Sequence, residues 1–117
     1  MKYMLLIYGN ADTWKALAAE GMEAVYAAHR AVLDETRASG ELLGSSGLTT
    51  EKARVVHVRD GVPAVTDGPF TESKEVLAGY YLFECSLERA TELASRLPEA
   101  PYSPIEVRAL ADPIPES

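Results

Sequence analysis

The feature that most constrains this chain is a pair of segments that are apolar on both alternating faces. Residues 76–84, VLAGYYLFE, are rich in residues that favour strands. Residues 2–8, KYMLLIY, would place Tyr3, Leu5 and Ile7 on one side of an extended strand, and Met4, Leu6 and Tyr8 on the other. Strands with this pattern are usually buried on both faces of a sheet. The fold must therefore cover both faces of any sheet that contains them.

Helix and turn signals order the rest of the chain. A short helix is predicted near 13–19 and a longer one near 21–39, which Gly40 would end. Asp60-Gly61 is a strong hairpin turn, and Pro63 on the return arm indicates an edge strand. The remaining predicted elements are strands at 41–48, 53–59, 62–66 and 104–110, and a helix at 87–97.

This order predicts an α+β fold of the ferredoxin-like βαββαβ type with an extra hairpin arm. Two helices can cover only one face of such a sheet. A second copy of the sheet is the simplest cover for the other face, so the sequence predicts a homodimer.

Composition limits the classes of function. The chain has 117 residues and a net charge of −7, which predicts one domain over 1–117, with a frayed tail at 112–117, and disfavours nucleic acid and anionic lipid as partners. With two histidines and one cysteine, a zinc site is not expected, and no motif for a cofactor is present. The apolar stretch at the N-terminus is too short to cross a membrane, so the expected location is the cytoplasm.

The segment DGPFTESKE, residues 67–75, precedes the second apolar strand. Together with KYMLLIYG, SGELLGSSGL, VHVRDG and PIEVRAL, it closely resembles the signature of the YCII-related, or DGPF-domain, family of small bacterial proteins. The resemblance covers nearly the whole chain and implies a dimeric α+β barrel.

The resemblance implies less about function. Some relatives carry a His–Asp pair proposed to do acid/base chemistry, and the wider superfamily includes enzymes that modify aromatic rings or isomerise lactones. Other relatives are encoded beside, or fused to, sigma factors of the extracytoplasmic-function class. His29 matches the relatives' histidine because it stands eleven positions before Gly40.

His29 has two interpretations. It lies on the apolar face of its predicted helix, where a packed core histidine is the more common finding. It could instead be a general base, because imidazole titrates near neutral pH and a carboxylate can fix its tautomer. We take Asp67 as the partner carboxylate.

The DGPF loop also has two interpretations. Asp, Gly and Pro explain a tight turn without any ligand, but they do not explain the aromatic and polar residues that follow. The side chains that we expect to line a pocket with His29 and Asp67 are Tyr8, Ser45, Ser46, Phe70, Ser73 and Lys74.

Two hypotheses of function follow. In the first, the protein is a dimer that binds a small molecule and transfers protons, without a cofactor, on an aromatic or lactone-like acid. In the second, it is a non-catalytic partner module linked to sigma-factor-dependent transcription control. A closed polar pocket around His29 would favour the enzyme, and an apolar patch left uncovered in the dimer would favour the module.

Overall fold

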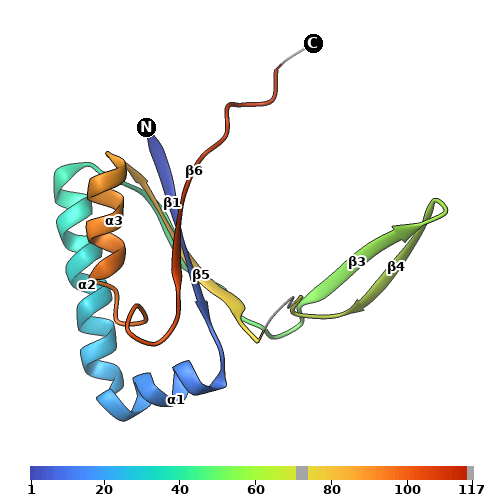
Figure 1. Ribbon diagram of the computed structural model, residues 1–117, viewed down its shortest axis with the longest axis horizontal. Helices are drawn as coiled ribbons and strands as arrows, with labels where there is room; N and C mark the ends of the chain where they lie inside the picture. The colour runs from blue at the N-terminus through green and yellow to red at the C-terminus, as the bar shows by residue number, and fades with distance from the viewer. Residues whose placement is uncertain (71–73, 116–117) are drawn as a thin grey trace.

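A computed structural model describes residues 1–70 and 74–115 of the chain, and Figure 1 shows its elements. In chain order these are β1 (Lys2–Gly9), α1 (Ala11–Glu20), α2 (Met22–Ser39), β2 (Leu42–Gly47), β3 (Arg54–Arg59), β4 (Val62–Asp67), β5 (Val76–Glu84), α3 (Leu87–Ser95) and β6 (Ile105–Ala109). The predicted elements are confirmed, with ends that differ by one or two residues.

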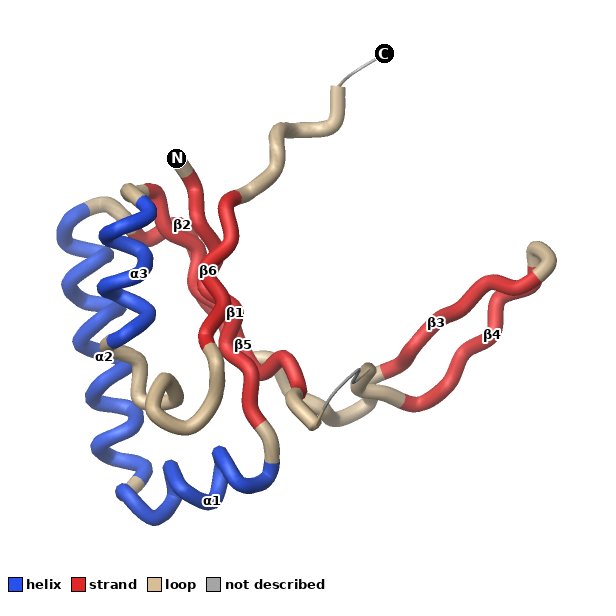
Figure 2. Tube along the Cα trace, in the orientation of Figure 1, coloured by secondary structure: helices blue, strands red, loops and turns tan. Residues whose placement is uncertain are grey.

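Four strands form an antiparallel sheet in the order β2-β5-β1-β6. This order is compatible with the predicted ferredoxin-like α+β arrangement. The two segments that are apolar on both faces, β1 and β5, occupy its centre, as the pattern required. Figure 2 shows α2 and α3 side by side along one face of this sheet.

The hydrophobic core lies between the sheet and these helices. Tyr3, Leu5 and Ile7 of β1 point toward the helices and are buried. They form one cluster with buried side chains of β5, α2, α3 and the turn after α3, namely Tyr81, Phe83, Val32, Ala90, Leu93, Ala94 and Leu97. Cys85 packs against the edge of this cluster, and burial raises the pKa of its thiol.

The opposite sheet face, which we call the outer face, carries none of the helices in the described part of the chain (Figure 2). Met4, Leu6 and Tyr8 of β1 lie there beside Tyr80 and Leu82 of β5, all half-buried. The sheet therefore has two apolar faces. The described helices cover the face that carries Tyr3, Leu5 and Ile7 (Figure 2).

An arginine fastens α3 to α2 and to the start of β2. Arg89 lies 2.7 Å from a carboxylate oxygen of Glu35 and 2.9 Å from one of Glu41. Hydrogen bonds from Arg96 and then Arg89 lower the pKa of Glu35 to about 2. These contacts fix the two helices against one another and so fix the position of α2 over the sheet.

The start of α1 differs from the prediction. Asn10 is the N-cap: its side chain accepts the backbone N–H of Thr13 at 3.0 Å, and the Thr13 hydroxyl accepts the backbone N–H of Asn10 at 3.1 Å. The helix therefore begins at Ala11, two residues before the predicted start near residue 13.

Strands β3 and β4 form a separate two-stranded ladder, the arm, which projects from the body (Figure 1). The radius of gyration is 16.4 Å, compared with about 13 Å for a compact domain of this length. Four valines of the arm are more than half exposed: Val56 61%, Val58 65%, Val62 64% and Val65 54%. An isolated two-stranded hairpin is at best marginally stable in water.

Gly68, at the base of the arm, is explained by close packing. It is not among the glycines with positive φ. A Cβ at Gly68 would lie 3.2 Å from the Cβ of Ala53 and 3.3 Å from Cγ2 of Val55, and its backbone N–H donates to the Ala53 carbonyl at 2.8 Å. The glycine thus allows the base of the arm to close.

Candidate functional site

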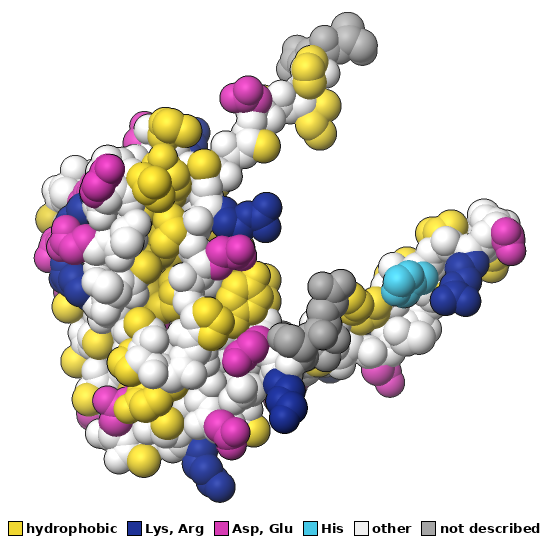
Figure 3. Space-filling view, viewed as in Figure 1, with side chains coloured by type: hydrophobic (Ala, Val, Ile, Leu, Met, Phe, Trp, Pro, Cys, Tyr) yellow, Lys and Arg dark blue, Asp and Glu magenta, His cyan; other side chains and the backbone are white. Residues whose placement is uncertain are grey.

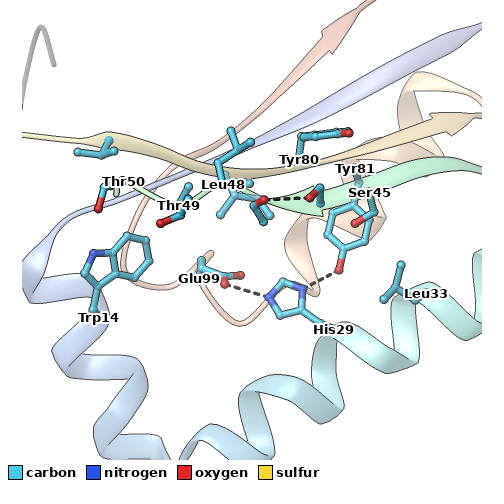
Figure 4. A pocket seen from close by; sticks show the side chains of 16 residues that line it. Trp14, His29, Leu33, Ser45, Leu48, Thr49, Thr50, Tyr80, Tyr81 and Glu99 are labelled. Carbon is cyan, nitrogen blue, oxygen red and sulfur yellow. Dashed lines mark hydrogen bonds and ion pairs between the residues drawn. The ribbon is translucent and has the colours of Figure 1, made fainter. Parts of the chain in front are cut away.

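His29 of α2 is held at both ring nitrogens. Its Nδ1 lies 2.6 Å from the hydroxyl of Tyr81 on β5, and its Nε2 lies 2.9 Å from Oε2 of Glu99. Figure 4 shows the three side chains in a row, from three separate parts of the chain. This is a carboxylate–imidazole–phenol chain, with the histidine in the middle.

The direction of these hydrogen bonds follows from which groups can donate. A carboxylate only accepts, so Nε2–H donates to Glu99. In the neutral imidazole Nδ1 is then a lone pair, and it accepts the proton of the Tyr81 hydroxyl. His29 is therefore assigned as the Nε2–H tautomer, with Nδ1 available to take up a proton.

Tyr81 remains a phenol at neutral pH. Burial, and to a smaller extent the nearby charge of Glu99, raises its pKa to about 12. Its ring stacks on His29, with centroids 5.9 Å apart, and on Phe83, with centroids 5.5 Å apart. The pleat of β5 positions this hydroxyl, because Tyr81 lies on the helix side of the sheet and Tyr80 on the outer side.

Glu99 lies in the turn after α3, where two backbone N–H groups, those of Tyr102 and Ser103, donate to its carbonyl at 2.9 and 3.0 Å. Ser103 also bonds through its hydroxyl to that of Thr13 on α1, at 2.5 Å, with both residues buried. The turn is thus tied to α1, and this places the Glu99 carboxylate at His29. Glu99 is only 7% exposed, and its Oε1 is buried and accepts no hydrogen bond from the described residues.

His29, Tyr81 and Glu99 line a cavity of about 600 Å³ between the sheet and the helices. A volume of this size suits a small organic molecule. The other described residues that line it are Ile7, Trp14, Leu33, Ser45, Ser46, Gly47, Leu48, Thr49, Thr50, Val76, Ala78, Gly79 and Tyr80. These described lining residues include hydroxyls, one carboxylate and one imidazole, and no Lys or Arg.

Trp14 of α1 forms one wall of the cavity, and Figure 4 shows its indole facing the space beside Glu99. The six-membered ring packs directly over Gly9, so closely that a Cβ on Gly9 would overlap it. Asn10 in addition donates to Glu75 at 3.2 Å, which links the start of α1 to the segment before β5. The position of the indole therefore depends on the glycine that ends β1.

The structure brings some of the predicted site residues together and not others. His29, Ser45 and Ser46 line the cavity. Tyr8 lies on the outer face, where its hydroxyl donates to Glu106 at 3.2 Å; burial, and then the charge of Glu106, raises its pKa.

The predicted pairing of His29 with Asp67 is wrong within the chain. Asp67 is the exposed last residue of β4, opposite Arg54 in the arm, and both nitrogens of His29 are occupied by other groups. The carboxylate that we expected from the DGPF loop comes instead from Glu99. The physical reason is that β4 belongs to the arm and leads away from the helices.

Phe70 and Lys74 of the DGPF loop do not line the cavity either. Phe70 is 60% exposed, and Lys74 is exposed and outside the lining. Ser73 lies outside the described residues.

Glu99 and Tyr81 were missed as members of the site. Glu99 sits between Pro98 and Ala100 in a proline-rich turn that reads as an ordinary helix end. Its one signal is a carboxylate two positions after the buried Leu97. Tyr81 lies inside an apolar strand, and alternation correctly separates it from Tyr80, but alternation does not say which of the two meets the helices.

Two comparisons place the chain among known proteins. The model of the YCII-related domain matches residues 1–112. The chain belongs to the YCII-related family. It is also similar to an uncharacterized protein of Rhizobium meliloti (strain 1021), with 37% identity over 116 residues, covering 95% of this chain and 93% of that protein. The family resemblance seen in the DGPF motif is thereby confirmed.

None of the helices in the described part of the chain is long and apolar enough to cross a membrane.

Proposed function

We propose that this YCII-related protein binds a small aromatic or lactone-like compound in the cavity and transfers a proton on it without a cofactor. One observation carries the proposal: His29 lies on the cavity wall with Glu99 on Nε2 and Tyr81 on Nδ1. A general base needs a lone pair that can take up the proton, here Nδ1 acting through the Tyr81 hydroxyl, and a group that stabilises the imidazolium. The Glu99 carboxylate stabilises the imidazolium, which is the role that the sequence predicted for Asp67.

The proton step follows the chain of hydrogen bonds. A C–H proton of the substrate passes to the Tyr81 oxygen while the Tyr81 proton passes to His29 Nδ1. The electron pair of the broken C–H bond stays on the substrate as an enolate, and the imidazolium lies between Tyr81 and the Glu99 carboxylate. Return of the proton to another carbon of the substrate completes an isomerisation and restores all three side chains.

The active assembly in this proposal is a homodimer of the α+β barrel type. The support is that Met4, Leu6 and Leu82 make the outer face apolar and that the arm exposes Val56 and Val58. Figure 3 shows hydrophobic side chains along the arm and on the body. A second copy would cover these surfaces with its own equivalents.

The exposed arm also favours the second hypothesis, a partner module with a sigma-factor link. An arm whose valines remained exposed in the dimer would fit a docking surface for another protein. The two hypotheses differ in what they require of His29, because a docking module has no use for an imidazole held between a phenol and a carboxylate.

The test is proton exchange on α-hydroxy-γ-butyrolactone, an uncharged lactone that carries a hydroxyl and can lose and regain one proton at the carbon beside its carbonyl. The exchange rate in D₂O is followed by proton NMR for the wild type, His29→Asn and His57→Asn. We expect the wild type to accelerate exchange and His29→Asn to lose about 100-fold or more, as loss of a general base commonly does.

His57→Asn is the matched control, since His57 lies on the exposed arm opposite Ala64 and outside the cavity lining. Equal rates for the two variants, or no acceleration by the wild type, would contradict the proposal. Thermal melts of both variants establish that they are folded.

A further inference from the structure

We infer, building on the proposed function, that the ligand is an uncharged or cationic ring compound that donates an N–H or O–H to Glu99. It is not a carboxylic acid. This changes the substrate class expected from the sequence, which was a small acid. Three observations support this ligand class. Glu99 has an unused acceptor atom, the described lining residues include no Lys or Arg, and several of them are apolar.

Glu99 has spare capacity to accept hydrogen bonds. Its Oε2 takes the Nε2–H of His29, while Oε1 is buried and accepts nothing from the described residues. A carboxylate offers about four acceptor sites, and a buried one that is poorly satisfied is costly. Because Glu99 lines the cavity, a donor on a bound ligand approaches it from that side.

The charges of the cavity oppose an anion. The described lining residues hold one carboxylate, and no Lys or Arg among them balances it. Both nitrogens of His29 are already engaged by Tyr81 and Glu99. A bound carboxylate would therefore face Glu99 without a counter-ion, and like charges in a partly desolvated site repel strongly.

The walls suit a ring that carries a donor. Trp14, Leu48 and Val76 are apolar, and the Trp14 indole offers a flat face that also attracts cations. Ser45, Thr49 and Thr50 add hydroxyls that donate or accept. An apolar wall beside a carboxylate is the combination that recognises an amine or alcohol with a ring attached.

The experiment compares benzylamine, benzyl alcohol and benzoate, which share one ring and differ in the head group. Trp14 is the chain's one tryptophan, so its indole N–H signal in a proton–nitrogen spectrum reports on the cavity. We expect benzylamine or benzyl alcohol to shift this signal at millimolar concentration, and benzoate to leave it unchanged.

Glu99→Gln then tests the role of the carboxylate. We expect it to weaken benzylamine binding by about 10-fold to 100-fold, the range for a hydrogen bond to a charged group. Glu88→Gln is the matched control, because Glu88 is exposed on α3 and outside the cavity lining, and its benzylamine affinity should equal that of the wild type.

Each alternative outcome is decisive. Benzoate that shifts the indole signal as strongly as benzylamine overturns the ligand class and leaves the proton-transfer proposal to the exchange rates. Equal benzylamine affinities of Glu99→Gln and Glu88→Gln would also overturn the ligand class, because the Glu99 carboxylate would then play no part in binding. If none of the three compounds moves the signal, the inferred ligand class is overturned, and the exchange rates alone decide the proton-transfer proposal.

Discussion

At the scale of single residues, the site depends on side chains that each do one thing. Glu99 accepts a hydrogen bond from His29, and Tyr81 donates one to His29. Trp14 forms one wall of the cavity. None of these residues is near another in the sequence, so the site exists only when the turn after α3, strand β5 and helices α1 and α2 are all in place. Substitutions at residues that pack against these side chains should therefore change the shape of the cavity.

Gly9→Ala is such a change. The added Cβ would overlap the Trp14 ring, so the indole must turn away from the end of β1. We expect a loss of about 1–3 kcal/mol in the free energy of unfolding, the usual cost of overpacking. We also expect a red shift of the tryptophan fluorescence as the indole becomes more exposed.

Gly44→Ala is the control for this change. A Cβ at Gly44 meets nothing within 4 Å, and its φ is not positive. This variant should keep the fluorescence of the wild type and lose little or no stability. A Gly9→Ala protein with unchanged fluorescence and stability would mean that the indole does not rest on Gly9 in solution.

At the scale of elements, most of the fold could be predicted and half of the site could not. The apolar runs at 2–8 and 76–84 place β1 and β5 in the centre of the sheet, and Asp60-Gly61 gives the turn of the arm, because these signals are local. His29 could be found for the same reason, from its position on the apolar face of a helix.

The partner of His29 could not be found in this way. The contact with Glu99 joins residues that are 70 positions apart, and it depends on a turn that the Thr13–Ser103 hydrogen bond ties to α1. The sequence favours Asp67 because the DGPF segment leads directly into the second apolar strand. The pattern does not reveal that the arm between β2 and β5 is a separate ladder that leads away from the helices.

At the scale of the whole molecule, the two uncovered apolar surfaces predict a homodimer. The outer face and the arm together expose more apolar side chains than one chain can cover. Sedimentation at micromolar concentration should give the mass of a dimer. Val58→Asp, which places a charge on the arm, should shift the protein toward the monomer if the arm is part of the contact.

Asp60→Asn is the control for Val58→Asp, since Asp60 is an exposed turn residue at the tip of the arm. A wild type that sediments as a stable monomer would exclude the dimer. A dimer unaffected by Val58→Asp would restrict the contact to the outer face.

The central claim is that His29 lies between Glu99 and Tyr81 as the Nε2–H tautomer, and histidine side-chain nitrogen NMR tests it most directly. At a pH where the ring is neutral, the account predicts a protonated Nε2 and an unprotonated, hydrogen-bonded Nδ1. In Tyr81→Phe the Nδ1 signal should move, while His57 on the exposed arm keeps its spectrum. A protonated Nδ1, or a His29 spectrum averaged over both tautomers, would contradict the account.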